Sequence, residues 1–131
     1  MSRLSERIQN FNNAYSLFDE MCKNYLADKQ SNSNRLALTQ SFEIVFELGW
    51  KVIKDYLKIK GVEVYTPKDV IKSAFSSEII KNGQVWIDML DSRNASSHEY
   101  NQDKVDKILE KISSEYYSEL KIFRESEIFN G

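Results

Sequence analysis

The sequence predicts an all-α protein, an up-and-down antiparallel four-helix bundle with one additional short helix. Only one proline and four glycines interrupt the 131 residues. Apolar residues recur at spacings of three and four through most of the chain, and no strand-like alternation of comparable length is present. The length suits one domain with one core, which we expect to span residues 1–131.

The first predicted helix begins near the N-terminus and ends before the polar stretch 28–34. Its apolar residues repeat at alternating spacings of four and three, and they are Leu4, Ile8, Phe11, Tyr15, Phe18, Cys22 and Tyr25. This pattern is typical of a helix packed lengthwise against others. Serine and asparagine residues within 28–34 prefer turns and caps, so the helix should end there. The single cysteine, Cys22, lies within the pattern and should be a buried thiol.

The second predicted helix carries two apolar stripes. The first stripe contains Leu38, Phe42, Val45, Gly49, Val52, Tyr56 and Ile59, and the second contains Phe46, Trp50, Ile53 and Leu57. A helix with so wide an apolar arc must contact several neighbours or a second subunit. Gly49 would let another backbone come close. We therefore expect a homodimer.

Capping signals place the third helix. Gly61 is expected to end the second helix, because glycine is favoured just past a helix C-terminus. The run Thr66-Pro67-Lys68-Asp69 has the order of an N-cap, a proline at the first helical position and an acid in the first turn. The short helix that follows should run to about Phe75.

Two further helices complete the predicted bundle. The run 85–90 begins a fourth helix, which carries Arg93 at its far end. Asn101 or Asp103 is expected to cap the last helix. The apolar residues of that helix are Val105, Ile108, Ile112, Tyr116, Leu120 and Phe123.

Composition restricts the environment and the partners. The chain has 18 Lys and Arg against 20 Asp and Glu, a net charge of −2. This balance argues against an extended basic surface, so we expect no DNA binding, although a compact site for RNA is compatible with it. No segment approaches the ~18 uninterrupted apolar residues of a membrane span, and the N-terminus lacks the apolar core of a signal peptide. We expect a cytoplasmic protein without membrane contact.

The densest cluster of functional groups lies in residues 93–100, which include the only histidine. The imidazole of His98 can act as a general acid or base near neutral pH, and the guanidinium of Arg93 can donate two hydrogen bonds to a phosphate. Together they suit phosphodiester cleavage. An arginine and a histidine near a helix end would also fit a solvated face or a partner of the helix dipole.

Helix geometry separates the two groups unless the chain bends. On an unbroken helix, Arg93 and His98 would lie roughly 140° apart. Asn94, Ser96 and Ser97 are weak helix formers that bond to nearby backbone, so they favour a bend here. A site shared across a two-fold axis is the other geometric solution.

The segment from Arg93 to Tyr100 fits the pattern Arg-x4-His-x-Tyr, and three further blocks accompany it in order. They are LTQSFE with ELGWK (38–51), TPKDV (66–70) and WIDMLDSRN (86–94). From about Leu4 to Phe123, the chain resembles HepT-type proteins of the HEPN superfamily, which are also described as nucleotidyltransferase substrate-binding proteins.

The resemblance implies a dimeric bundle in which the motifs of both subunits meet at a cleft. It implies the toxin of a two-gene toxin–antitoxin system, a hydrolase that cleaves RNA internally without a metal or cofactor. His98 would move a proton at a ribose oxygen, Arg93 would stabilise charge on the phosphate, and Asn94 would support them. A partner, a minimal nucleotidyltransferase, would neutralise the toxin by attaching AMP to Tyr100. The alternative is a non-catalytic substrate-binding or regulatory subunit of a nucleotidyltransferase.

Several acidic residues have both a functional and a structural interpretation. Asp88 and Asp91 lie three apart on the fourth helix, so they could bind a metal or orient His98, or belong to a solvated face. Glu47 and Lys51 are spaced for an ion pair along the second helix. A partner-binding role for this pair together with Glu43 is the alternative.

The two tryptophans lie among apolar residues at helical spacing. Trp50 and Trp86 are expected in the core, although either could stack on a base.

Overall fold

The computed structural model describes residues 2–96 and 102–129. The helices are α1 (Arg3–Ala27), α2 (Asn32–Ile59), α3 (Pro67–Ser76), α4 (Gly83–Ser96), α5 (Gln102–Lys111), the π-helix η1 (Ile112–Tyr116), α6 (Tyr117–Arg124) and the 3-10 helix η2 (Glu127–Phe129). Because α5, η1 and α6 follow one another directly, they form one continuous last helix. The described ranges contain no strand. The predicted all-α bundle with one short helix, α3, is confirmed.

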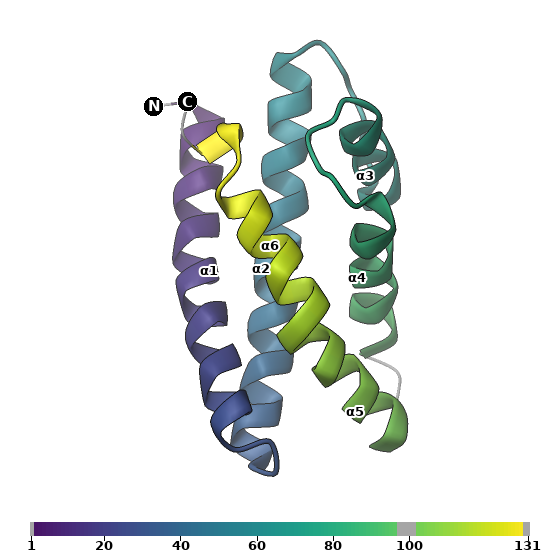
Figure 1. Cartoon of the computed structure of the whole chain (residues 1–131). Helices are drawn as coiled ribbons and strands as arrows, with labels where there is room; N and C mark the ends of the chain where they lie inside the picture. The colour runs from purple at the N-terminus through teal and green to yellow at the C-terminus, as the bar shows by residue number, and fades with distance from the viewer. Residues whose placement is uncertain (1, 97–101, 130–131) are drawn as a thin grey trace.

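The arrangement brings the beginning of α1 and the end of α6 to the same end of the bundle (Figure 1). α1 and α2 run side by side in opposite directions, and the last helix crosses them diagonally in this view. α3 and α4 lie on the other side of α2. In the described part of the chain, no helix is both long and apolar enough to cross a membrane.

Local sequence signals set most helix ends as predicted. Thr66 Oγ1 accepts a hydrogen bond from the Asp69 amide at 3.2 Å, with Pro67 in the first turn of α3. Gly61 adopts a φ of 89° just past α2. The Val62 amide there donates to the Leu57 carbonyl, and the Gly61 amide donates to that of Lys58. This pair of hydrogen bonds is a Schellman motif, which ends α2 as the glycine predicted.

Of the two residues predicted to cap the last helix, the structure describes only Asp103. α5 begins at Gln102, so Asp103 stands in its first turn and is not its cap. Asn101 lies outside the described residues. Helix boundaries inferred from sequence shift by one or two residues because several polar residues in succession can each serve as a cap.

Both apolar stripes of α2 are buried within one chain. The side chains enclosed there are Leu38, Phe42, Val45, Val52, Phe46, Trp50, Ile53 and Leu57. Tyr56 is half-buried, and Ile59 is 65% exposed because the helix ends there without a neighbour to cover it. Since α1, α3, α4 and the last helix all contact α2, its wide apolar arc does not by itself require a second subunit.

The single thiol is part of this core. Cys22 is free and buried, as predicted, and burial raises the pKa of the thiol to about 12. It is therefore protonated at neutral pH.

The expectation for Gly49 is corrected in one respect. A Cβ atom at this position would lie 3.2 Å from Phe11 Cε1 and 3.7 Å from Trp86 Cη2. Aromatic rings, and not another backbone, occupy the space beside the glycine. Phe11 is fully buried and packs against the rings of Tyr15, Phe123 and Phe129, so it has little freedom to move.

Substitution of Gly49 tests this packing. We expect Gly49→Leu to lower the free energy of unfolding by about 2 kcal/mol or more, because the added side chain would overlap the Phe11 ring. Urea unfolding followed by circular dichroism measures the change. Gln40→Leu adds the same side chain at an exposed position of α2 and should leave the midpoint near that of the parent. A Gly49→Leu protein with the parent's midpoint would contradict the interpretation.

Candidate functional site

The structure describes four of the six predicted site residues, which are Asp88, Asp91, Arg93 and Asn94. Arg93 and Asn94 lie in the last turns of α4, where Arg93 was expected. His98 and Tyr100 lie outside the described residues. The convergence of Arg93 with His98, by a bend or across a two-fold axis, therefore stays a prediction.

The Arg93 side chain reaches across to α2. Its Nη2 atom lies 3.0 Å from Glu47 Oε2, and its Nη1 atom donates to Asn94 Oδ1 at 3.4 Å. The side chains of Arg93 and Glu47 are 37% and 29% exposed, so solvent reaches both. The contact holds the guanidinium at the surface where α2 and α4 meet.

Two further groups fix the Glu47 carboxylate. The indole Nε1 of Trp50 donates to Glu47 Oε2 at 3.1 Å, and Lys51 Nζ lies 3.4 Å from Glu47 Oε1. The predicted pairing of Glu47 with Lys51 is thus confirmed. Both tryptophans are buried, as expected, but the N–H of Trp50 also binds this carboxylate. Glu47 therefore connects the core of α2 to Arg93.

A second set of contacts fixes the backbone of α4 next to Arg93. Ser92 is buried, and its Oγ atom lies 2.6 Å from Tyr116 Oη. The same tyrosine hydroxyl makes a 3.1 Å hydrogen bond to the Asp88 carbonyl oxygen. Burial raises the pKa of Tyr116, so its hydroxyl is neutral at physiological pH. The π-helix thus attaches the last helix to the turn of α4 that leads into Arg93.

The two aspartates of α4 lie on its solvated part. Asp88 is half-buried, and its Oδ1 atom accepts a hydrogen bond from the side-chain Nε2 of Gln84 at 2.9 Å. Asp91 is exposed. Over the residues that the structure describes, no three His, Cys, Asp or Glu side chains converge in a way that could hold a metal ion.

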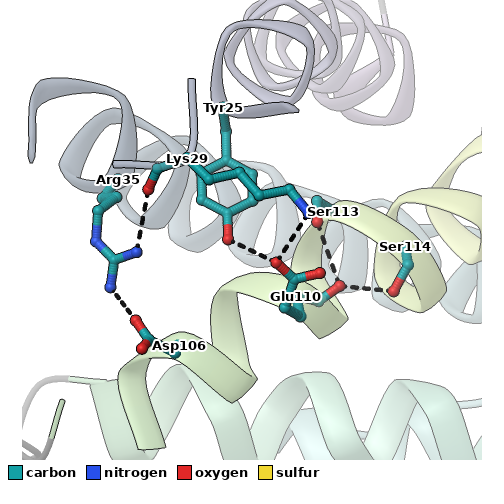
Figure 2. Close-up of polar contacts among 7 residues, drawn as sticks. All are labelled: Tyr25, Lys29, Arg35, Asp106, Glu110, Ser113 and Ser114. Atoms are coloured by element: carbon teal, nitrogen blue, oxygen red, sulfur yellow. Dashed lines mark hydrogen bonds and ion pairs between the residues drawn. The ribbon is translucent and has the colours of Figure 1, made fainter. Parts of the chain in front are cut away.

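A polar cluster links the last helix to the turn between α1 and α2 (Figure 2). Tyr25 Oη donates to Glu110 Oε1 at 3.0 Å, and Lys29 Nζ lies 3.2 Å from the same oxygen. Arg35 pairs with Asp106 and also donates to the Lys29 carbonyl at 3.2 Å. These residues line a depression of about 390 Å³. Through Asp106 and Glu110, in the middle and near the end of α5, the cluster fixes the helix that directly follows residues 97–101 in the sequence.

Hydrogen bonds within this cluster lower the pKa values of two carboxyl groups. Arg35 holds the pKa of Asp106 below its ordinary value of 3.8 by hydrogen bonding to the charged form. Lys29, and after it Tyr25, lowers the pKa of Glu110 from its ordinary 4.5. Sequence reasoning missed these contacts because no local spacing relates residues 25–35 to residues 106–110.

Three comparisons with known proteins bear on the family and the fold of this chain. The family model described as nucleotidyltransferase substrate binding protein like matches residues 6–126. A Haemophilus influenzae protein named probable ribonuclease HepT is 33% identical over 70 residues, which cover 50% of this chain and 48% of that relative. The chain thus aligns with about half the length of that curated relative. A Thermus thermophilus protein of known crystal structure superposes with a TM-score of 0.75 at 25% identity, covering 88% of this chain and 99% of the other.

The pH dependence of stability tests the Arg35–Asp106 pair. Folding lowers the pKa values of Asp106 and Glu110. Their ionised forms therefore stabilise the protein fully above their ordinary pKa values, and this stabilisation is lost as the pH falls through the lowered pKa values of the folded state. We expect the free energy of unfolding to decrease from about pH 5 to about pH 3. In Arg35→Ala the decrease should be shallower, whereas Lys107→Ala, at an exposed position of the same helix as Asp106, should keep the parent's slope. Equal slopes in the parent and Arg35→Ala would show that the pair has no such role.

Proposed function

The chain belongs to the nucleotidyltransferase substrate binding protein like family, and on that premise we propose that it is the toxin of a two-gene toxin–antitoxin system, an endoribonuclease. The observation that carries the proposal is the Arg93 guanidinium, held partly exposed at the end of α4 just before the segment with the only histidine. Similarity to a probable ribonuclease HepT supports it. We place the protein in the cytoplasm, where RNA is available.

The proposed reaction is transfer within the RNA backbone. A ribose 2′-oxygen forms a bond to the adjacent phosphorus, and the bond from phosphorus to the 5′-oxygen of the next nucleotide breaks. His98 moves the proton lost by the 2′-hydroxyl or gained by the leaving oxygen. Arg93 donates hydrogen bonds to the phosphate oxygens as their charge builds, and Asn94 helps to orient it. These residues need no metal or cofactor for the step.

A homodimer would bring two copies of the motif to one cleft. The exposed apolar residues on α2 support such a contact: Leu36 is 59% exposed, and Ile44, one turn from Glu47, is 48% exposed. Because Ile44 lies one turn from Glu47, which pairs with Arg93, burial of this surface between two chains would place Arg93 of each subunit close to the interface.

A minimal nucleotidyltransferase is the proposed antitoxin. It would join the Tyr100 oxygen to the α-phosphate of ATP and release pyrophosphate. The attached AMP would bring negative charge and bulk to the proposed cleft, which would keep an RNA phosphate from reaching Arg93.

The family description favours a second candidate function, a non-catalytic subunit that presents a substrate to a nucleotidyltransferase or regulates it. Such a subunit would form a stable complex with that enzyme, and its purified dimer would not cleave RNA.

Cleavage of RNA in EDTA by the unmodified protein tests the proposed activity. We expect His98→Ala to reduce cleavage by about a hundredfold or more, because proton transfer at the ribose oxygen is lost. Circular dichroism should show that the variant remains folded. Cleavage by His98→Ala at the parent's rate would rule out the mechanism, and an unmodified dimeric parent without activity would favour the non-catalytic subunit.

Intact-mass analysis after incubation with the partner enzyme and ATP tests the modification. We expect the parent to gain AMP and Tyr100→Phe to gain none, because the accepting hydroxyl is missing. Tyr65→Phe removes the hydroxyl of another tyrosine, a residue that is 68% exposed, and should gain AMP like the parent. AMP attachment to Tyr100→Phe at the parent's level would show that another residue is modified.

A further inference from the structure

We propose that Glu47 is a positioning residue for Arg93, which fixes the guanidinium in the orientation that an RNA phosphate requires. This role rests on the proposed endoribonuclease activity. It gives a function to a carboxylate on α2 that lies far from the motif in the sequence.

The contacts form a chain from the core to the surface. Trp50 is 7% exposed, and its rigid indole is held by the packing of α2. Its Nε1 donates to Glu47 Oε2 at 3.1 Å, and the same oxygen lies 3.0 Å from Arg93 Nη2. Lys51 lies 3.4 Å from the other oxygen. Both oxygens of the carboxylate are therefore engaged, so the carboxylate has little freedom to rotate.

An anchored carboxylate restricts a side chain that is otherwise flexible. Arginine has several rotatable bonds, but its guanidinium is planar, so a hydrogen bond to one terminal nitrogen limits the directions of the remaining donors. The guanidinium has five N–H donors in total, so a contact with Glu47 is compatible with hydrogen bonds to a phosphate. Glu47 would orient the Arg93 guanidinium before the substrate binds. The side chain would then need to move less on the way to the transition state.

The local charge also suits this role. Among these three residues, the two cations of Lys51 and Arg93 exceed the single carboxylate of Glu47 by one positive charge. A phosphate would still be attracted to Arg93. Because both side chains of the Glu47–Arg93 pair are partly exposed, the pair should contribute little to stability, and an effect on catalysis can be measured separately.

Kinetics of RNA cleavage by the full-length parent, Glu47→Ala and Glu47→Gln test the role. We expect Glu47→Ala to lower kcat about tenfold or more, because misoriented catalytic groups slow the reaction, while KM changes less than about twofold. Glu47→Gln keeps an oxygen acceptor for Trp50 or Arg93 and should restore part of kcat. Asp55→Ala removes a carboxylate that also lies 3.0 Å from an arginine, Arg7, but between α1 and α2, and should cleave like the parent.

Nitrogen NMR of the arginine side chains gives a readout that a merely structural role of Glu47 would not move. In the parent, the contact with Glu47 should slow the exchange of the terminal N–H groups of Arg93, so that they give resolved signals. In Glu47→Ala these signals should average into one, while the thermal midpoint of unfolding stays unchanged. A Glu47→Ala protein with the parent's kcat or with unaltered Arg93 signals would overturn the role. A parent that cleaves no RNA would overturn the proposed function and this role together, whereas an equally active Glu47→Ala would overturn the role alone.

Discussion

The burial of both stripes of α2 is the constraint on which the rest of the structure depends. One helix with two apolar faces must be covered on more than one side, so α1 packs on one side of α2, α3 and α4 pack on the other, and the last helix crosses from α1 to α4. This arrangement brings the end of α4 beside the middle of α2, where Glu47 lies just outside the buried stripes. The candidate site thus stands at the edge of the core, with its polar groups in solvent and their supports inside.

Arg93 is held in two different ways. Its backbone is attached through Ser92 and Tyr116 to the last helix, and its guanidinium is attached through Glu47 to α2. A site built from two supporting helices is more rigid than one carried by a single helix end, where the last turn frays. The polar cluster around Glu110 gives α5 a comparable attachment to the turn between α1 and α2.

The sequence predicted the parts of this structure that depend on local patterns. The spacing of apolar residues such as Phe11, Phe18 and Phe42 identified buried faces, because residues three or four apart in a helix lie on the same face. The same spacing misplaced Ile59, since it takes no account of where the covering helices stop. The pair Glu47–Lys51 follows from spacing along one helix, whereas Glu47–Arg93 depends on the packing of two helices and could not be inferred that way. The roles of His98 and Tyr100 came from the resemblance of a motif and stay predictions.

The π-helix at Ile112–Tyr116 has a consequence for how the length of this chain can vary. A π-turn holds one more residue than an α-turn, and each residue rotates an α-helix by about 100°. A relative one residue shorter between 112 and 116 would therefore have an α-turn in place of the π-turn, and the side chains before and after it would keep their faces. Contacts like those of Glu110 with Tyr25 and of Tyr116 with Ser92 could then both persist, whereas a deletion elsewhere in the last helix would turn one of them away. The π-helix η1 is thus the place where the last helix can lose one residue between its two attachments.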